Sequence, residues 1–179
     1  MIDHREFFVE LDFTIEMPLI ERMREILDTI SFIRTKYECS VQFSNILEPD
    51  QQIKFGNKLD DYFASRNSLQ MFLIIQPYSY LPWHFDPSKE RTTVINIPLY
   101  EYDDSHQTYF SGAPTREELG YDLYKIVQLK YKFAHPYMLN SKAKLHCVFN
   151  PTDIPRKIFS ICTETSYKDA VAWFGDLAL

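Results

Sequence analysis

The stretch AKLHCVFNPTDIPRKIFSICT, residues Ala143 to Thr163, contains two runs of apolar, aromatic and β-branched residues on either side of a turn. Such runs are typical of β-strands, and we expect strands at Ala143–Asn150 and Lys157–Thr163. Pro151 and Pro155 interrupt the segment between them, where a continuing strand would need backbone donors. These residues therefore predict two neighbouring strands joined by a short turn.

The rest of the chain shows the same short-strand pattern. The N-terminal stretch EFFVELDFTI is a further candidate, and other strands are expected at Val41–Ile46, Leu69–Gln76, Thr92–Tyr100, Gln107–Phe110 and Leu123–Phe133. Many short strands after one helix indicate a mostly β protein with flanking helices, either a sandwich or a jelly roll.

Three segments have helical features. MPLIERMREILDTISFIRTKY places apolar residues at helical spacing and has Pro18 near its start, so we expect a helical region at about residues 17–36. Asn57–Arg66 is a candidate short helix, and the C-terminal tail is expected to form a last helix with Ser166 as N-cap. The 179 residues fit a single domain, 1–179.

Composition and charge favour some classes of partner over others. The net charge of −6 makes nucleic acid an unlikely partner, because phosphate binding needs a basic face. No apolar run approaches the length of a membrane span, and the charged N-terminus lacks the pattern of a signal peptide. Three cysteines, Cys39, Cys147 and Cys162, form no CxxC pair. We expect a cytoplasmic protein with no membrane partner.

One short segment carries a possible pair of metal ligands. In LPWHFDPSKERTTVINIPLY, residues 81–100, His84 and Asp86 are two residues apart, so an extended chain would point both toward one face. An imidazole and a carboxylate placed in this way can share a divalent metal. The pair alone is a weak signal, since a surface hydrogen-bonded pair has the same spacing.

A third ligand comes from the stretch quoted first. Strand alternation places His146 on one face and Cys147 on the other, so Cys147 is not expected to be a ligand. We expect His146 to be the distal ligand in preference to His106, because no strand that carries an arginine follows His106 at the right distance. Arg156 follows ten residues later and is suited to gripping a carboxylate. Two histidines and one carboxylate occupy one face of an octahedral metal, the geometry typical of non-haem Fe(II) oxygenases.

At these residues the sequence resembles the Fe(II)/2-oxoglutarate-dependent oxygenases. The flanking residues are most similar to the aspartyl/asparaginyl β-hydroxylase-like branch, in which H-x-D…R-x-x-x-x-N-x-P-L and N…H-x-V-x-N…R recur. Besides the three ligands and Arg156, the matching positions here are Arg91, Asn96, Pro98, Leu99, Asn140, Val148 and Asn150. The resemblance covers roughly residues 69–163.

The resemblance implies a double-stranded β-helix, a cupin-like jelly roll, with the metal at one open end. It implies that His84, Asp86 and His146 hold Fe(II), and that Arg156 binds the far carboxylate of the co-substrate 2-oxoglutarate. Asn96 and Ser160 are the further candidates for the co-substrate site, and Tyr78 and Tyr80 remain open alternatives for its hydroxyl donor.

The implied reaction couples O₂ and 2-oxoglutarate to hydroxylation of a C–H bond, with an amino acid, free or within a peptide, as substrate. Three alternatives remain at this point. One is a cupin-like metalloprotein that does not use 2-oxoglutarate, another is a non-catalytic jelly-roll binding or structural module, and the third acts on a nucleic-acid base. Arg156 favours the oxygenase, because it has little purpose without an anion to bind.

Overall fold

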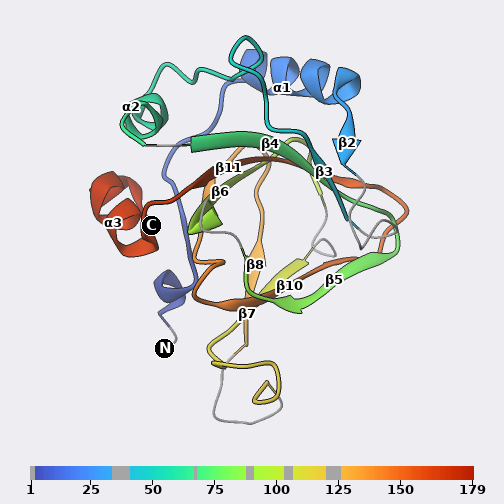
Figure 1. Ribbon diagram of the computed structural model, residues 1–179, viewed down its shortest axis with the longest axis vertical. Coiled ribbons are helices and arrows are strands. Elements are labelled where there is room, and N and C mark those ends of the chain that lie inside the picture. The colour runs from blue at the N-terminus through green and yellow to red at the C-terminus, as the bar shows by residue number, and fades with distance from the viewer. Residues whose placement is uncertain (1–2, 34–40, 67, 88–90, 103–106, 120–125) are drawn as a thin grey trace.

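The protein folds into two antiparallel sheets that face each other, with helices packed outside the larger one (Figure 1). The computed structural model describes residues 3–33, 41–66, 68–87, 91–102, 107–119 and 126–179. This two-sheet arrangement is the jelly roll expected from the strand pattern, mostly β with flanking helices.

The larger sheet has seven strands in the order β1-β9-β6-β11-β4-β3-β2. Its central strand β11 (Arg156–Thr163) is paired with β4 (Ser68–Ile75) and β6 (Thr93–Pro98). The outer strands are β1 (Phe8–Glu10), β2 (Phe32–Ile33), β3 (Val41–Ser44) and β9 (Tyr137–Leu139). Because β11 lies between two partners, it is buried along almost its whole length, which explains its nearly continuous apolar sequence.

The smaller sheet has four strands in the order β5-β10-β7-β8. These are β5 (Ser79–His84), β7 (Gln107–Ser111), β8 (Ile126–Lys130) and β10 (Leu145–Asn150). The pairing of β10 with β5 sets His146 directly opposite His84, and a bulge follows before Val148 meets Leu81. This register brings together two histidines that are 62 positions apart in the sequence.

The helices cover the outer face of the larger sheet (Figure 1). They are α1 (Met17–Thr29), α2 (Lys58–Ala64) and α3 (Tyr167–Phe174), with short 3₁₀ turns at His4–Glu6 and Gly175–Leu177. Ile20, Met23 and Leu27 of α1 pack in one apolar cluster with Phe72 and Phe159 of the sheet. Side chains alternate along β11, so Phe159 points toward the helices, whereas Arg156 and Ile158 point toward the smaller sheet.

The structure also corrects several expected boundaries. The helical region expected at 17–36 ends at Thr29, because Ile30 is extended and Phe32–Ile33 pairs with β3 as a strand; residues 34–36 lie outside the described ones. The N-terminal strand is reduced to Phe8–Glu10. Strands β5 and β9 were not expected at all. Asn57 and Ser166 do cap α2 and α3 through their side chains.

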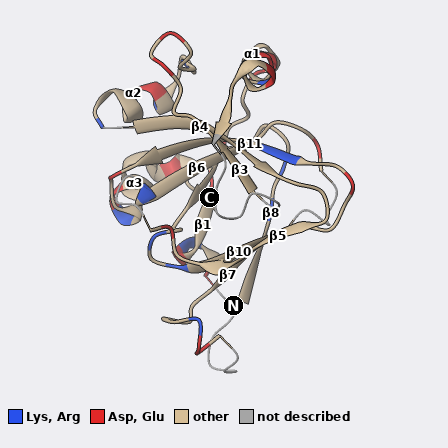
Figure 2. Ribbon diagram, turned by 45° about the vertical axis from the view of Figure 1, so that its right-hand side comes forward, with Lys and Arg blue, Asp and Glu red and all other residues tan. Residues whose placement is uncertain are grey.

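No helix of the described chain is long and apolar enough to cross a membrane. Acidic segments lie on α1 and α2 and on neighbouring loops, and the basic segments of the described residues are scattered over several elements (Figure 2).

Candidate metal centre

Three predicted ligands meet in a cavity between the two sheets. One ligand atom from each of His84, Asp86 and His146 lies within 4.8 Å of the others. His84 ends β5, His146 lies on the neighbouring β10, and Asp86 follows two residues after β5. The Asp86 backbone N–H donates to the Ser141 carbonyl at 3.0 Å, so a main-chain contact rather than regular strand geometry holds Asp86 in place.

Both histidines present the same ring nitrogen toward the cavity. Nδ1 of His84 lies 2.7 Å from the Pro82 carbonyl, and Nδ1 of His146 lies 3.2 Å from the Lys144 carbonyl. A carbonyl only accepts, so each Nδ1 carries the proton and each Nε2 keeps a lone pair. In metal sites of proteins, a hydrogen bond from the ring nitrogen that does not bind the metal orients the histidine, and Nδ1 makes this bond here.

The protonation states also suit metal binding. Burial lowers the pKa of His84, and burial followed by repulsion from His84 lowers the pKa of His146 to about 4. Burial alone would raise the pKa of Asp86, but the charge of Arg91, reinforced by His146, places it below its usual range. At neutral pH the three side chains are therefore two neutral imidazoles and one carboxylate, all in the form that binds a cation.

The donor set fits a divalent metal such as Fe(II). The Nε2 of His84 lies 3.9 Å from Oδ1 of Asp86, and the two imidazole rings are 4.2 Å apart between centroids. Metal–ligand bonds of about 2.1 Å would place adjacent ligands about 3 Å apart, so binding would draw these atoms slightly together. The second oxygen of Asp86 makes no hydrogen bond within the described chain and is ion-paired with Arg91 at 3.3 Å.

Arg156 reaches the same cavity from the larger sheet. Its side chain is only 1% exposed, and its guanidinium donates to the Gln107 carbonyl and to the Thr108 hydroxyl. Within the described chain no carboxylate pairs with it, and its Nε has no hydrogen-bond partner. Burial lowers the pKa of Arg156, since an unpaired cation is costly inside a protein. The buried guanidinium of Arg156 is therefore suited to bind an anion in the cavity.

Asn96, Ser160 and Tyr131 form a hydrogen-bonded chain beside Arg156. The Ser160 hydroxyl donates to Oδ1 of Asn96, and Nδ2 of Asn96 donates to the Tyr131 hydroxyl at 3.2 Å. Asn96 and Tyr131 line the cavity, whereas Ser160 is not among the lining residues that the structure describes. The guanidinium of Arg156 lies 4.4 Å from the centre of the Tyr131 ring. Ser160 therefore positions Asn96 and does not itself face the cavity.

Tyr131 was missed in the sequence, although a signal was present. It lies one residue beyond β8 and two residues after the buried Leu129, so strand alternation directs both side chains inward. Its hydroxyl accepts from Asn96, which leaves its own proton free to donate into the cavity. Tyr131 is thus a better placed hydroxyl donor than Tyr78 and Tyr80, which are exposed.

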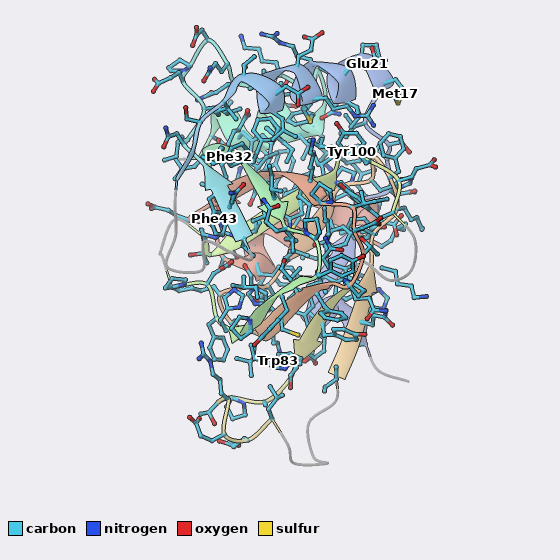
Figure 3. All side chains as sticks on the ribbon, turned by 90° about the vertical axis from the view of Figure 1, so that its right-hand side faces the viewer. Met17, Glu21, Phe32, Phe43, Trp83 and Tyr100 are labelled. Atoms are coloured by element: carbon cyan, nitrogen blue, oxygen red, sulfur yellow. The ribbon has the colours of Figure 1, made fainter. Side chains whose placement is uncertain are left out.

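Other residues singled out in the sequence have different positions. Asn140 donates to the Glu6 carbonyl and ties the N-terminus to β9. Asn150 bonds to the carbonyls of Ile75, Gln76 and Ile154 and holds the turn before β11. His106, the alternative ligand, lies outside the described residues. Trp83, labelled in Figure 3, and Cys147 line an apolar groove on the outer side of the smaller sheet, and strand alternation predicted the outward position of Cys147.

The metal-free protein will lose stability as the pH falls from 7 to 4. The pKa of His146 is about 4 in the folded protein and about 6.5 when unfolded. The unfolded chain binds the proton first, so the free energy of unfolding decreases through this window by about 3 kcal/mol from His146 alone. Urea unfolding at several pH values checks this, with His146→Gln as the variant expected to flatten the curve. An equally steep curve for that variant would contradict the assignment.

Comparisons with known proteins identify the fold. No family model matches the sequence, and no curated protein sequence matches it. Among solved structures, an oxidoreductase of the 2OG-Fe(II) oxygenase family from Burkholderia pseudomallei is 10% identical with a TM-score of 0.63, covering 90% of this chain and 86% of that one. The protein therefore has the double-stranded β-helix fold, as predicted.

Two further structures share this fold. A prolyl hydroxylase from Trichoplax adhaerens, in complex with a hypoxia inducible factor peptide fragment, is 12% identical with a TM-score of 0.62, covering 87% and 82% of the two chains. HygX from Streptomyces hygroscopicus, with nickel, 2-oxoglutarate and hygromycin B bound, is 11% identical with a TM-score of 0.59, covering 91% and 87%. At such identities the likeness concerns the fold, and function must be argued from the site.

Proposed function

We propose that the protein is an Fe(II)- and 2-oxoglutarate-dependent dioxygenase that hydroxylates a C–H bond. The observation that carries this proposal is the shared cavity: two neutral histidines and one carboxylate lie beside a buried arginine that has no acidic partner within the described chain. A bound metal ion explains why the two histidines and the carboxylate lie together. Only an anionic ligand explains why the arginine is buried beside them.

Each side chain has a defined role in this proposal. His84, Asp86 and His146 hold Fe(II) through Nε2, Oδ1 and Nε2, and leave three positions open. Arg156 binds the far carboxylate of 2-oxoglutarate, and the Tyr131 hydroxyl donates to the same group. Asn96 fixes the Tyr131 hydroxyl and is itself fixed by Ser160. Sites of this kind rely on charge-assisted hydrogen bonds that are already oriented before the ligand arrives.

The overall reaction consumes O₂, 2-oxoglutarate and R–H and yields succinate, CO₂ and R–OH. Fe(II) held by His84, Asp86 and His146 would supply the activation of O₂. The described protein supplies orientation and a dry environment, since apolar side chains of Leu73, Val94, Leu139 and Ile158 complete the cavity wall. The cavity measures about 40 Å³, room for one or two waters.

The branch and the substrate class belong to the proposal as well. The aspartyl/asparaginyl β-hydroxylase-like branch rests on the sequence pattern alone, since the fold comparisons give it no support. A small molecule or a peptide is the proposed substrate, in line with neighbours whose structures contain either kind. That the protein is cytoplasmic, consists of a single domain and binds neither membrane nor nucleic acid also stays a prediction.

The proposal predicts a slow conversion of 2-oxoglutarate even without substrate. Purified protein with Fe(II), O₂ and ascorbate as reductant is expected to form succinate, measured by ¹H NMR. An Asp86→Ala variant, shown to be folded by far-UV circular dichroism, is the matched control because it lacks the carboxylate ligand. Adding candidate amino acids and peptides and looking for faster succinate formation then becomes the substrate screen. Equal succinate formation by the Asp86→Ala variant would contradict the proposal.

A different outcome favours one of the other functions. If the protein binds metal but does not respond to 2-oxoglutarate, a cupin-like metalloprotein becomes the better account, and another anion must pair with Arg156. If it binds no metal, the non-catalytic binding or structural module becomes the better account.

A further inference from the structure

Arg91 pairs with a different oxygen of Asp86 from the one that lies near His84. Oδ1 of Asp86 lies 3.9 Å from Nε2 of His84, whereas Oδ2 lies 3.3 Å from Nε of Arg91. The two oxygens of one carboxylate are thus shared between the candidate metal position and a guanidinium. The sequence pattern included Arg91 but gave no indication of this contact.

Arg91 is held in place from several sides. Its Nη1 approaches the Met71 sulfur at 3.7 Å, and its guanidinium lies 5.4 Å from the centre of the Phe43 ring. Phe43 belongs to β3 of the larger sheet, across from the strand that carries Trp83 (Figure 3). The Arg91 side chain is 18% exposed, so it lies at the border of the cavity and is largely shielded from water. In such surroundings an ion pair keeps its geometry better than on an open surface.

The number of oxygens that Asp86 gives to a metal decides how many positions remain. A carboxylate can bind a cation through one oxygen or through both. With two histidines, one oxygen leaves three open positions on an octahedral metal and two oxygens leave only two. A bidentate co-substrate together with O₂ needs three. A group that pairs with Oδ2 and keeps it off the metal would therefore leave the third coordination position open for O₂.

We infer that Arg91 is a positioning residue that keeps Asp86 a one-oxygen ligand. This inference rests on the proposed function and adds a role that the two histidines and Arg156 do not fill. The ion pair engages Oδ2, whereas Oδ1 is the oxygen that lies 3.9 Å from Nε2 of His84. Partners of this kind, which bond to a ligand rather than to the metal, typically change metal affinity or activity by about 10–100-fold when removed.

The test separates metal binding from co-substrate binding. Arg91→Met and Arg91→Lys are compared with wild type, first by titrating each metal-free protein with Co(II) alone, and then by titrating the Co(II)-loaded protein with 2-oxoglutarate under visible absorbance. For Arg91→Met we expect Co(II) to bind at least as tightly as to wild type, since a nearby positive charge is gone and Oδ2 is free. We expect 2-oxoglutarate to bind about 10-fold or more weakly, because it must displace that oxygen.

The lysine variant and a crystal structure complete the design. Arg91→Lys keeps the charge and is expected to recover most of the 2-oxoglutarate affinity. A crystal structure of Ni(II)-loaded Arg91→Met should show both oxygens of Asp86 on the metal, against one in wild type. Weakened Co(II) binding in both variants would show a merely structural role, and unchanged 2-oxoglutarate affinity in both would overturn the inference. Failure of wild type to bind 2-oxoglutarate would instead count against the proposed function.

Discussion

Replacing His146 with alanine will weaken Fe(II) binding by more than 100-fold and reduce succinate formation to background. His146 supplies one of only three protein ligands, so its loss should exceed the effect of removing a partner outside the metal shell. The side chain is 6% exposed and stacks on Phe110, with ring centroids 5.5 Å apart, so its removal also costs some stability. Isothermal titration of the metal-free protein under anaerobic conditions measures the affinity.

A matched control separates this effect from nonspecific metal binding. His135 is another partly buried histidine, but it contacts Thr14 and Glu10 away from the cavity. His135→Ala should leave the Fe(II) affinity within about threefold of wild type, whereas far-UV circular dichroism should show that both variants are folded. Similar losses in the two variants would mean that His146 has no special role.

Replacing Arg156 with methionine will weaken 2-oxoglutarate binding to a comparable degree and will change the affinity for the metal very little. Removing one partner of a buried charge pair costs about 3–5 kcal/mol, which corresponds to a loss of about 10²–10⁴-fold in 2-oxoglutarate affinity. The ligand-free variant should be more stable than wild type, by about 1 kcal/mol or more, because wild type buries a guanidinium without a carboxylate.

Lys157 offers the matched control for this charge change. It is the next residue on β11, and its ammonium group lies 5.3 Å from the Tyr100 ring on the opposite face of the sheet. Lys157→Met should bind 2-oxoglutarate as wild type does and show no gain in stability. A loss of stability in Arg156→Met, together with unchanged 2-oxoglutarate binding, would show that Arg156 serves only the packing of the two sheets.

The strands that carry the site were largely predictable, because each has a strong local pattern. The alternation of Leu145, His146 and Cys147 placed His146 inward, and the apolar run that follows Arg156 marked the central strand β11. Strand β5 was missed because it contains Pro82, which is tolerated in this position since β5 is an edge strand. Strand β9 has three residues, too few to show a period.

The contacts within the site were less predictable than its residues. Ser160 lies on the same face of β11 as Arg156, but its hydroxyl donates to Asn96, its neighbour on the adjacent strand β6. The pairing of Arg91 with Asp86 depends on a loop path, and no periodicity in the sequence specifies such a path. The sequence suggested that Arg156 binds an anion, but it could not show that the side chain is buried with no acidic partner in the described chain. Burial is a property of the fold.

The most direct test is an anaerobic titration of the metal-free protein with Fe(II) and then with 2-oxoglutarate, followed by visible absorbance. The account predicts a weak charge-transfer band that needs both components, is absent in His146→Ala, and requires far more 2-oxoglutarate in Arg156→Met. Such a band reports that the metal and the co-substrate are in direct contact. If Fe(II) binds and no band develops at any 2-oxoglutarate concentration, or if the band persists without His146, the proposed oxygenase site is wrong.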